Sequence, residues 1–286
     1  MATVDQILKS LDHLPAIPTA VTQLIGNLMG GGDDPSAEPT SKIVMRDSAL
    51  TTAVLRVANS AALGFQVSAV SIAEALSRVG ENQLLKIALA HASQAALGGP
   101  VEEYGLEEGE AWLGALAGAF AAEGIAKRTR TGDPNVAFTA ALLRDIGKLA
   151  MGLAVSADEL TEMLLTGEGD VVARERATLG FDHAQIGAAL GRAWGLPESL
   201  LNAIRFHHAP PEDDLADPLF DIVHCADCMA MMLGYGVGFD GLNYNLQPSS
   251  YELLGLDQIA LEDVLVEVRL RMSEFLAEQG QPQPQA

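Results

Sequence analysis

The second half of the chain holds most of the side chains that could bind a metal ion. Four of the six histidines and two aspartates fall there: His183, His207, His208, His224, Asp145 and Asp227. Neutral imidazoles and carboxylates are ligands that Mn, Fe and Zn accept. Their spacing is a poor guide, because only His207 and His208 are adjacent, and neighbours on a helix point about 100° apart. Composition alone therefore favours ordinary hydrogen-bonded histidines over a metal site.

Two further groups of residues are better explained as structure than as chemistry. Cys225-Ala-Asp-Cys228 forms a CxxC. A redox pair needs a helix N-terminus to lower a thiol pKa, whereas this one lies inside an apolar helical run, so we interpret it as two core thiols. The densest basic cluster, Lys127-Arg-Thr-Arg130, falls at a predicted helix end, where its charges complement the helix dipole. A bound phosphate or an acidic partner is the alternative there.

The elements that must position these side chains are predicted to be helices. Ala, Leu, Glu, Gln and Met are abundant, and no alternating strand is evident. Asp47 and Ser48 can cap a helix that begins at Ala49. Gly80 divides two helices, and residues 234–249 read as turns. The predicted helices cover residues 4–11, 19–29, 41–46, 49–63, 71–79, 82–97, 110–129, 135–153, 158–165, 171–179, 183–194, 198–208, 218–233 and 258–278.

Charge excludes several classes of partner. The 286 residues include 38 acidic and 17 basic side chains, a formal net charge of −21, and 49% are hydrophobic, enough for a sizeable core. Such an acidic chain does not attract nucleic acid or an anionic membrane directly. No run of about 18 apolar residues predicts a membrane span, and no signal peptide is evident. Two cysteines are typical of a reducing cytosol, so we predict a cytoplasmic location.

The order of several sequence motifs along the chain indicates a family resemblance. Ala141-Leu-Leu-Arg-Asp-Ile-Gly-Lys-Leu149 resembles the central motif of the HD superfamily of phosphohydrolases, helical proteins in which a His-Asp pair helps to hold a catalytic metal. Further segments match in order: Leu14-Pro-Ala-Ile-Pro18, Leu55-Arg-Val-Ala-Asn-Ser60, Ser71-Ile-Ala-Glu-Ala-Leu-Ser-Arg-Val-Gly80, Asp182-His-Ala-Gln-Ile-Gly187, Trp194-Gly-Leu-Pro197 and Ala203-Ile-Arg-Phe-His-His208. Over about residues 11–210 the chain resembles the HDOD family, the HD-related output domain of bacterial signalling proteins.

The resemblance implies an all-α fold, a multi-helix HD-like bundle with an N-terminal helical subdomain. We expect an N-terminal helical part at 1–100, a degenerate HD-like core at 101–210 and an acidic helical extension at 211–286. Residues 206–268 contain twelve carboxylates and no lysine or arginine. That acidic last third is a candidate surface for partners.

The chain departs from active HD enzymes at two of their four core ligands. The earlier histidine falls at or near Gly114, and the histidine of the His-Asp pair is Arg144. By resemblance, the vestigial pocket consists of Arg144, Asp145, Lys148, His183, His207, His208 and Asp227.

The replacement of a histidine by Arg144 has a direct electrostatic consequence. A guanidinium stays protonated and offers only donors, so it cannot bind a cation. We expect Arg144 to pair with Asp145 or Asp227 and to take over part of the role of the lost metal; the alternative is that it points to solvent. The residues left for a residual metal site are His183, His207, His208 and Asp227.

The resemblance thus implies a non-catalytic output or scaffold domain, with no catalytic residue, metal or cofactor. Its expected partners are signalling proteins: a kinase, a response regulator, or a cyclase or phosphodiesterase system. Exposed apolar helix faces would allow a homodimer. Two alternatives stay open. One is a metal-dependent phosphohydrolase with a rearranged site, and the other is a nucleotide or second-messenger sensor that uses the vestigial pocket.

Overall fold

The computed structural model describes residues 4, 17, 19–29, 39–59, 68–166, 168–239 and 246–278. Within these ranges the chain is helical, with one 3₁₀ turn at Glu102–Tyr104 and no β-structure beyond an isolated bridge between Val101 and Leu106. The predicted all-α fold is therefore confirmed. The helix predicted at 4–11 lies outside the described residues except for its first position.

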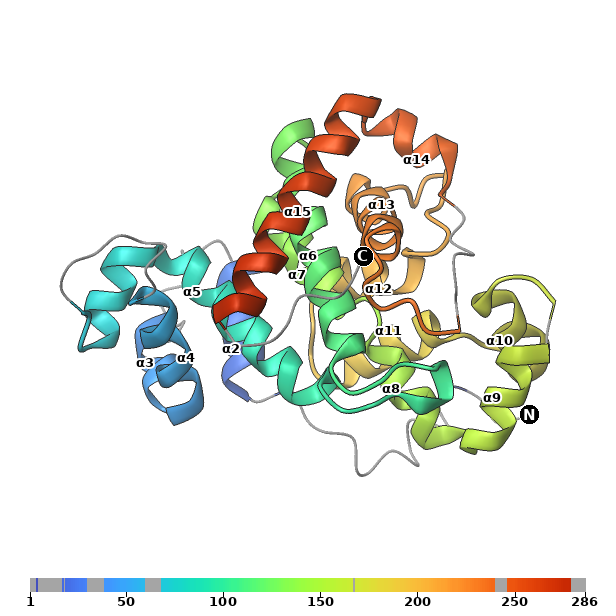
Figure 1. Cartoon of the computed structure of the whole chain (residues 1–286), viewed down its shortest axis with the longest axis horizontal. Coiled ribbons are helices and arrows are strands. Elements are labelled where there is room, and N and C mark those ends of the chain that lie inside the picture. The colour runs from blue at the N-terminus through green and yellow to red at the C-terminus, as the bar shows by residue number, and fades with distance from the viewer. Residues whose placement is uncertain are drawn as a thin grey trace.

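The helices keep the labels of Figure 1. Those of the front half are α2 (Thr19–Met29), α3 (Thr40–Met45), α4 (Ser48–Ala58) and α5 (Ile72–Leu97). Those that follow are α6 (Glu110–Thr129), α7 (Pro134–Leu143), α8 (Ile146–Ala154), α9 (Ala157–Thr166), α10 (Val171–Leu179), α11 (His183–Ala193), α12 (Glu198–Phe206), α13 (Pro218–Met232), α14 (Pro248–Leu253) and α15 (Gln258–Glu278). No helix in the described ranges is long and apolar enough to cross a membrane.

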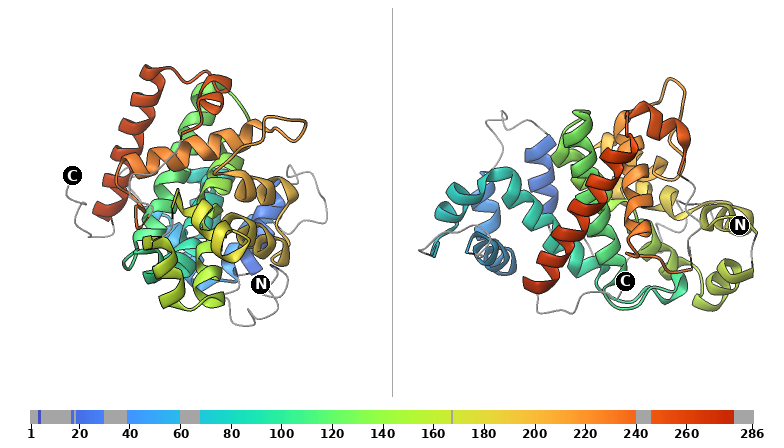
Figure 2. Two further views of the ribbon diagram at one scale, coloured as in Figure 1. Left: turned by 90° about the vertical axis from the view of Figure 1, so that its right-hand side faces the viewer. Right: turned by 45° about the horizontal axis from the view of Figure 1, so that its top comes forward.

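Helix α6 is the centre of the fold. It packs against α7, α13 and α15, and α2–α4 lie at one end of the molecule while α9 and α10 lie at the other (Figures 1 and 2). Its sequence alternates large residues such as Trp112 and Ile125 with many Ala and Gly residues, and nearly all of them are buried. Small side chains let the neighbouring helices approach α6 closely, so α7 and α13 pack directly against it.

One predicted helix is wrong, and the error lies at the site. The predicted helix at 135–153 is broken in the structure: α7 ends at Leu143, α8 begins at Ile146, and Asp145 is the N-cap residue with φ −99° and ψ 11°. The helical periodicity continues through the break, but Arg144 and Asp145 are drawn into a buried ion cluster. The break turns both side chains inward together, which a continuous helix would not do.

Other local predictions fare differently. The cap is confirmed, since the Asp47 side chain accepts hydrogen bonds from the backbone amides of Ala49 and Leu50 at 2.9 and 3.0 Å. The division at Gly80 is also confirmed, because its φ of 76° interrupts α5. Helix α14 falls within and beyond the predicted turn at 234–249 and was missed; Pro248 at its first position fixes a helical φ.

The Asp-Ile-Gly-Lys segment brings two helices into close contact. A Cβ atom on Gly147 would overlap the backbone carbonyl of His183. Only glycine therefore lets α8 pass so near the start of α11. This approach places Asp145, at the start of α8, beside His183, at the start of α11.

Candidate functional site

Arg144 lies at the centre of a buried ion cluster. Its side chain is 3% exposed, and its Nε lies 2.6 Å from Asp227 Oδ1 and 3.3 Å from Asp145 Oδ2. Its Nη1 and Nη2 donate to the carbonyls of Ala141 and Gly114 at 2.9 and 3.2 Å. The predicted pairing of Arg144 is thus confirmed, and it reaches both carboxylates rather than one.

The Arg144 guanidinium lies against a face of α6 that carries glycines in place of side chains, here called its bare face. A Cβ on Gly118 would overlap Arg144 Nη1, and one on Gly114 would come within 2.9 Å of Gly236 Cα. No side chain fits at these positions without moving a neighbour. Arg144 and the turn at Gly236 therefore fill the space on this face, where the resemblance places the earlier histidine.

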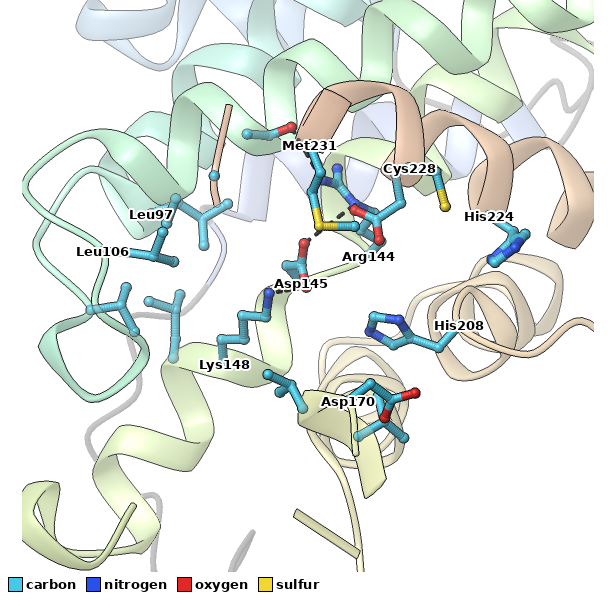
Figure 3. Close-up of a pocket in the computed structure, with 18 of the residues that line it drawn as sticks. Leu97, Leu106, Arg144, Asp145, Lys148, Asp170, His208, His224, Cys228 and Met231 are labelled. Carbon is cyan, nitrogen blue, oxygen red and sulfur yellow. Dashed lines mark hydrogen bonds and ion pairs between the residues drawn. The ribbon is translucent and has the colours of Figure 1, made fainter. Parts of the chain in front are cut away.

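Asp145 is neutralised from a second side by Lys148, whose Nζ lies 3.1 Å from Asp145 Oδ1. Burial raises the pKa of the Asp145 carboxyl, but Lys148 and Arg144 outweigh it and hold that pKa well below its ordinary value. Asp145 is therefore ionised at neutral pH. Figure 3 shows Arg144 and Lys148 on either side of it.

Three histidines meet Asp145 from the opposite side. The Nε2 atoms of His183 and His207 lie 3.5 and 3.9 Å from Asp145 Oδ1, and the Nε2 atoms of His183 and His208 lie 2.9 Å apart. One ligand atom from each of these four residues lies within 4.8 Å of every other. The fourth member proposed for a residual site was wrong: Asp145 joins the histidines, while Asp227 is held by Arg144.

Groups behind two of the histidines orient them. His183 Nδ1 lies 2.8 Å from Glu175 Oε2, and the hydroxyl of Tyr104 donates to Glu175 Oε1 at 2.5 Å. His207 Nδ1 donates to the carbonyl of Ile204 at 2.6 Å. Each of these bonds turns the Nε2 atom of its ring towards Asp145, as hydrogen bonds to the far nitrogen do for metal-binding histidines.

The sequence reasoning missed Glu175 and Tyr104. Glu175 is separated from His183 by a turn, and Tyr104 comes from a distant loop. A signal for Glu175 does exist in helical spacing. It shares a face of α10 with Val171 and Val172, and all three are buried.

The three imidazoles differ in the direction of their pKa shifts. Burial lowers the pKa of His183, but the ion pair and hydrogen bond with Glu175 outweigh it and raise that pKa above its ordinary value. Burial lowers the pKa of His207 to about 4, and burial and the neighbouring imidazoles lower that of His208 well below its ordinary value. The pKa of His183 is thus shifted in the opposite direction to those of the other two imidazoles, because His183 alone faces Glu175.

The remaining candidates take no part in this cluster. His224 uses both ring nitrogens, since Nδ1 donates to the His207 carbonyl at 2.8 Å and Nε2 accepts from the Gln247 amide at 3.0 Å. Cys225 and Cys228 are buried within α13, and burial raises the pKa of Cys225 to about 12. Both thiols are therefore protonated and unreactive, which agrees with their interpretation as core residues.

The three histidines and Asp145 fit one transition-metal ion. Asp145 Oδ1 and His207 Nε2 are buried and lack a hydrogen-bond partner among the described residues. Four atoms about 2.1 Å from a tetrahedral ion lie about 3.4 Å apart, close to the separations found here. Lys148 competes for the same Asp145 oxygen, so an ion bound there would share that oxygen with an ammonium.

A cavity of about 180 Å³ opens onto this arrangement. Arg144, Asp145, Lys148, His208 and Asp227 line it, whereas His183 and His207 are fully buried behind them. In Figure 3 the labelled apolar residues Leu97 and Leu106 close the side opposite His208. Of the three histidines, His208 alone lines the cavity, beside Arg144 and Lys148 and the carboxylates that pair with them.

The HDOD domain model matches residues 14–210. The chain belongs to the HDOD family. A solved HDOD domain protein of unknown function from Geobacter sulfurreducens is 21% identical, with a TM-score of 0.65 over 96% of this chain and 92% of that one. A "Putative signal transduction protein" from Marinobacter aquaeolei VT8 is 22% identical, with a TM-score of 0.68 over 96% of this chain and 60% of that one.

Other similar proteins carry different names. A "Putative phosphohydrolase" from Shewanella amazonensis SB2B is 22% identical, with a TM-score of 0.59 over 92% of this chain and 97% of that one. An uncharacterized protein of Treponema pallidum (strain Nichols) is 27% identical over 206 residues, 70% of this chain. The present chain spans 39% of the length of that relative. The structures share the HDOD fold, and the chemistry must be argued from the residues of this chain.

Proposed function

We propose that this HDOD domain is a non-catalytic signalling module whose former metal-binding centre is closed by an internal cation. The observation that carries this proposal is the position of Arg144, buried between Asp227 and Asp145 against the bare face of α6. A guanidinium there neutralises two carboxylates and offers no lone pair to a metal or to a water nucleophile. A hydrolytic metal must hold and acidify a water molecule in defined geometry. The space between Asp145 and Asp227 is already occupied by the Arg144 guanidinium.

A hydrolysis assay tests this proposal. The purified chain is incubated with manganese and bis(p-nitrophenyl) phosphate, then with nucleotides and cyclic dinucleotides. We expect no turnover above that of Asp145→Ala prepared in the same way. Turnover by the wild type that Asp145→Ala abolishes would show a working phosphohydrolase and overturn the proposal.

Protein contacts are the mode of action that the surface supports. Three apolar side chains of α15 are exposed: Ile259 at 70%, Val266 at 59% and Leu270 at 60%. Their spacing of seven and four residues puts them on one helix face, among the carboxylates of the acidic extension. We assign this face to a partner, either another signalling protein or a second copy of the chain. Sedimentation of the wild type and Val266→Glu distinguishes the two, because only a homodimer of α15 faces would dissociate.

A second candidate function is the binding of one metal ion by His183, His207, His208 and Asp145. His207 Nε2 favours it, because this buried atom has no hydrogen-bond partner among the described residues and lies 3.9 Å from Asp145 Oδ1. A bound ion would supply a fixed positive charge that ties α8 to α11 and α12. Metal analysis after incubation with zinc or manganese tests it: we expect one equivalent in the wild type and in the control His91→Gln, and none in His208→Ala. Equal metal content in all three proteins would refute the site.

A further inference from the structure

A second cavity lies where the front helices meet the central helices. Its volume is about 460 Å³, and its walls come from α4, α5, α6, α7 and α15. Helix α15 crosses α6 and ends near α5 at this junction (Figures 1 and 2). The residues that line it are all different from those of the site around Arg144. Cavities of about 300–1,000 Å³ are typical of small-molecule sites.

The floor of this junction cavity is aromatic. Trp112 and Phe138 are 3% and 1% exposed, and Phe120 and Phe275 are partly buried beside them. The rings of Trp112 and Phe275 meet edge to face with centroids 5.2 Å apart, and those of Phe120 and Phe138 are 6.0 Å apart. Arg271 Cζ lies 3.9 Å from the centroid of the Phe120 ring, and Lys86 Nζ lies 5.7 Å from that of Phe138. Trp112 and Phe275 are therefore the rings of the floor that a ligand ring can contact.

The wall and mouth of the junction cavity are cationic. Arg56, Arg78, Lys86 and Arg271 line it, against the single carboxylate of Glu274. These are four of only 17 basic residues in a chain of net charge −21. The local charge is thus opposite in sign to that of the whole molecule.

Glu123 is the anion that partly offsets this cluster. Its carboxylate, 3% exposed, lies 2.7 Å from Lys86 Nζ, 2.8 Å from Arg271 Nη1 and 2.7 Å from Lys127 Nζ. Burial raises the pKa of Glu123, but the three cations outweigh it and lower that pKa to about 2. The four cations that line the cavity thus outnumber the carboxylates of Glu123 and Glu274, although Arg271 Nη1 also lies 3.8 Å from Glu267 Oε1. Glu123 therefore fixes Lys86 and Arg271 in place without cancelling their charge.

We propose that the junction cavity binds a small organic anion that joins a flat ring to a phosphate or carboxylate, the chemistry of a nucleotide. The ring stacks on Trp112 and Phe275, and the anion faces Arg56 and Arg78, the two lining cations that come from the front helices. The amides of Gln83 and Gln94, which also line the cavity, can both donate to and accept from the polar edge of a ring.

A ligand in this position would join two parts of the molecule. Arg56 and Arg78 come from α4 and α5, whereas Trp112 and Phe275 come from α6 and α15. A molecule that contacts both groups stabilises their packing by mass action. The junction cavity is therefore a place where a small-molecule signal can act on the partner-facing helix α15.

The test uses Trp112 as a local reporter. The chain has two tryptophans, and Trp194, at the end of α11, is outside the cavity, so Trp194→Phe leaves Trp112 as the single emitter. The full chain is titrated with AMP, GMP and phenyl phosphate, and with adenosine and inorganic phosphate as halves of the ligand. We expect saturable changes in Trp112 emission with at least one ring-bearing phosphate, and affinities at least tenfold lower for adenosine and for inorganic phosphate.

Substitutions then locate the ligand. Arg56→Gln and Arg78→Gln are each expected to weaken binding about tenfold, as the loss of one charge-assisted contact does. Arg46→Gln, an exposed arginine of the same front part that does not line the cavity, is the matched control and should bind normally. Binding of phenyl phosphate without AMP or GMP would keep the site but exclude a nucleotide. No saturable binding at millimolar concentration, adenosine binding as tightly as AMP, or unchanged affinity in both cavity variants would overturn the proposal.

Discussion

Removal of the buried guanidinium is the most informative perturbation of this fold. Arg144→Met keeps most of the side-chain volume but removes the charge, so Asp227 loses the Nε contact at 2.6 Å. Asp145 retains Lys148 at 3.1 Å, which leaves Asp227 as the unpaired carboxylate. Breaking a buried ion pair on one side costs about 3–5 kcal/mol. In a chain of this size that corresponds to a loss of about 10 °C in Tm.

Urea unfolding followed by circular dichroism at pH 7 measures this cost. Arg192→Met is the matched control, because Arg192 pairs with Glu198 at 3.1 Å while both side chains are more than half exposed, at 61% and 68%. An exposed pair of this kind contributes about 0–1 kcal/mol. The double variant Arg144→Met with Asp227→Leu should recover much of the loss, since it leaves no buried charge without a partner at that position. The reasoning is refuted if Arg144→Met costs no more than Arg192→Met, or if the double variant costs the sum of its two single changes.

Three further perturbations have defined outcomes. Glu123→Gln should lower the free energy of unfolding by about 3 kcal/mol at pH 7. This difference from the wild type should shrink as pH falls from 4.5 towards the lowered pKa of about 2, because the stability contributed by ionised Glu123 is lost there. Urea unfolding curves that stay equally far apart at pH 3.5 and pH 7 would contradict this prediction. Gly118→Ala should lower the free energy of unfolding by about 1–3 kcal/mol, because its Cβ displaces the Arg144 guanidinium. In the control Gly26→Ala the new Cβ meets nothing within 4 Å, so the free energy of unfolding should rise by about 0.5–1 kcal/mol. Thermal unfolding measures both variants, and equal shifts in Tm would exclude the clash at Gly118. Zinc at a hundred times its Kd should stabilise the wild type and His91→Gln by about 2.7 kcal/mol, reversibly with EDTA, and should not stabilise His208→Ala.

Local signals in the sequence predicted most helices, because those signals act within a few residues. The Asp47 cap and the break at Gly80 each depend on one side chain or one backbone angle, and both were correct. Helical periodicity failed between Leu143 and Ile146. There the break is stabilised by Asp227, which lies more than eighty residues away and leaves no trace in the local pattern.

The candidate site was predictable in its members but not in its arrangement. The order of motifs identified Asp145 and the histidines, and the side chain of Arg144 itself predicted its pairing. Spacing did not show which carboxylate faces the imidazoles, because that depends on how closely Gly147 lets α8 approach α11. The junction cavity is assembled from α4, α5, α6, α7 and α15, so no local pattern in the sequence brings its cations together.

In the proposed function, Arg144 keeps any metal away from Asp227. Anomalous diffraction from crystals soaked in manganese tests it most directly. We predict that the guanidinium stays on Asp227 and that any manganese peak lies among Asp145, His183, His207 and His208. A peak between Asp145 and Asp227, with Arg144 displaced from both, would contradict the account and restore a hydrolytic metal centre.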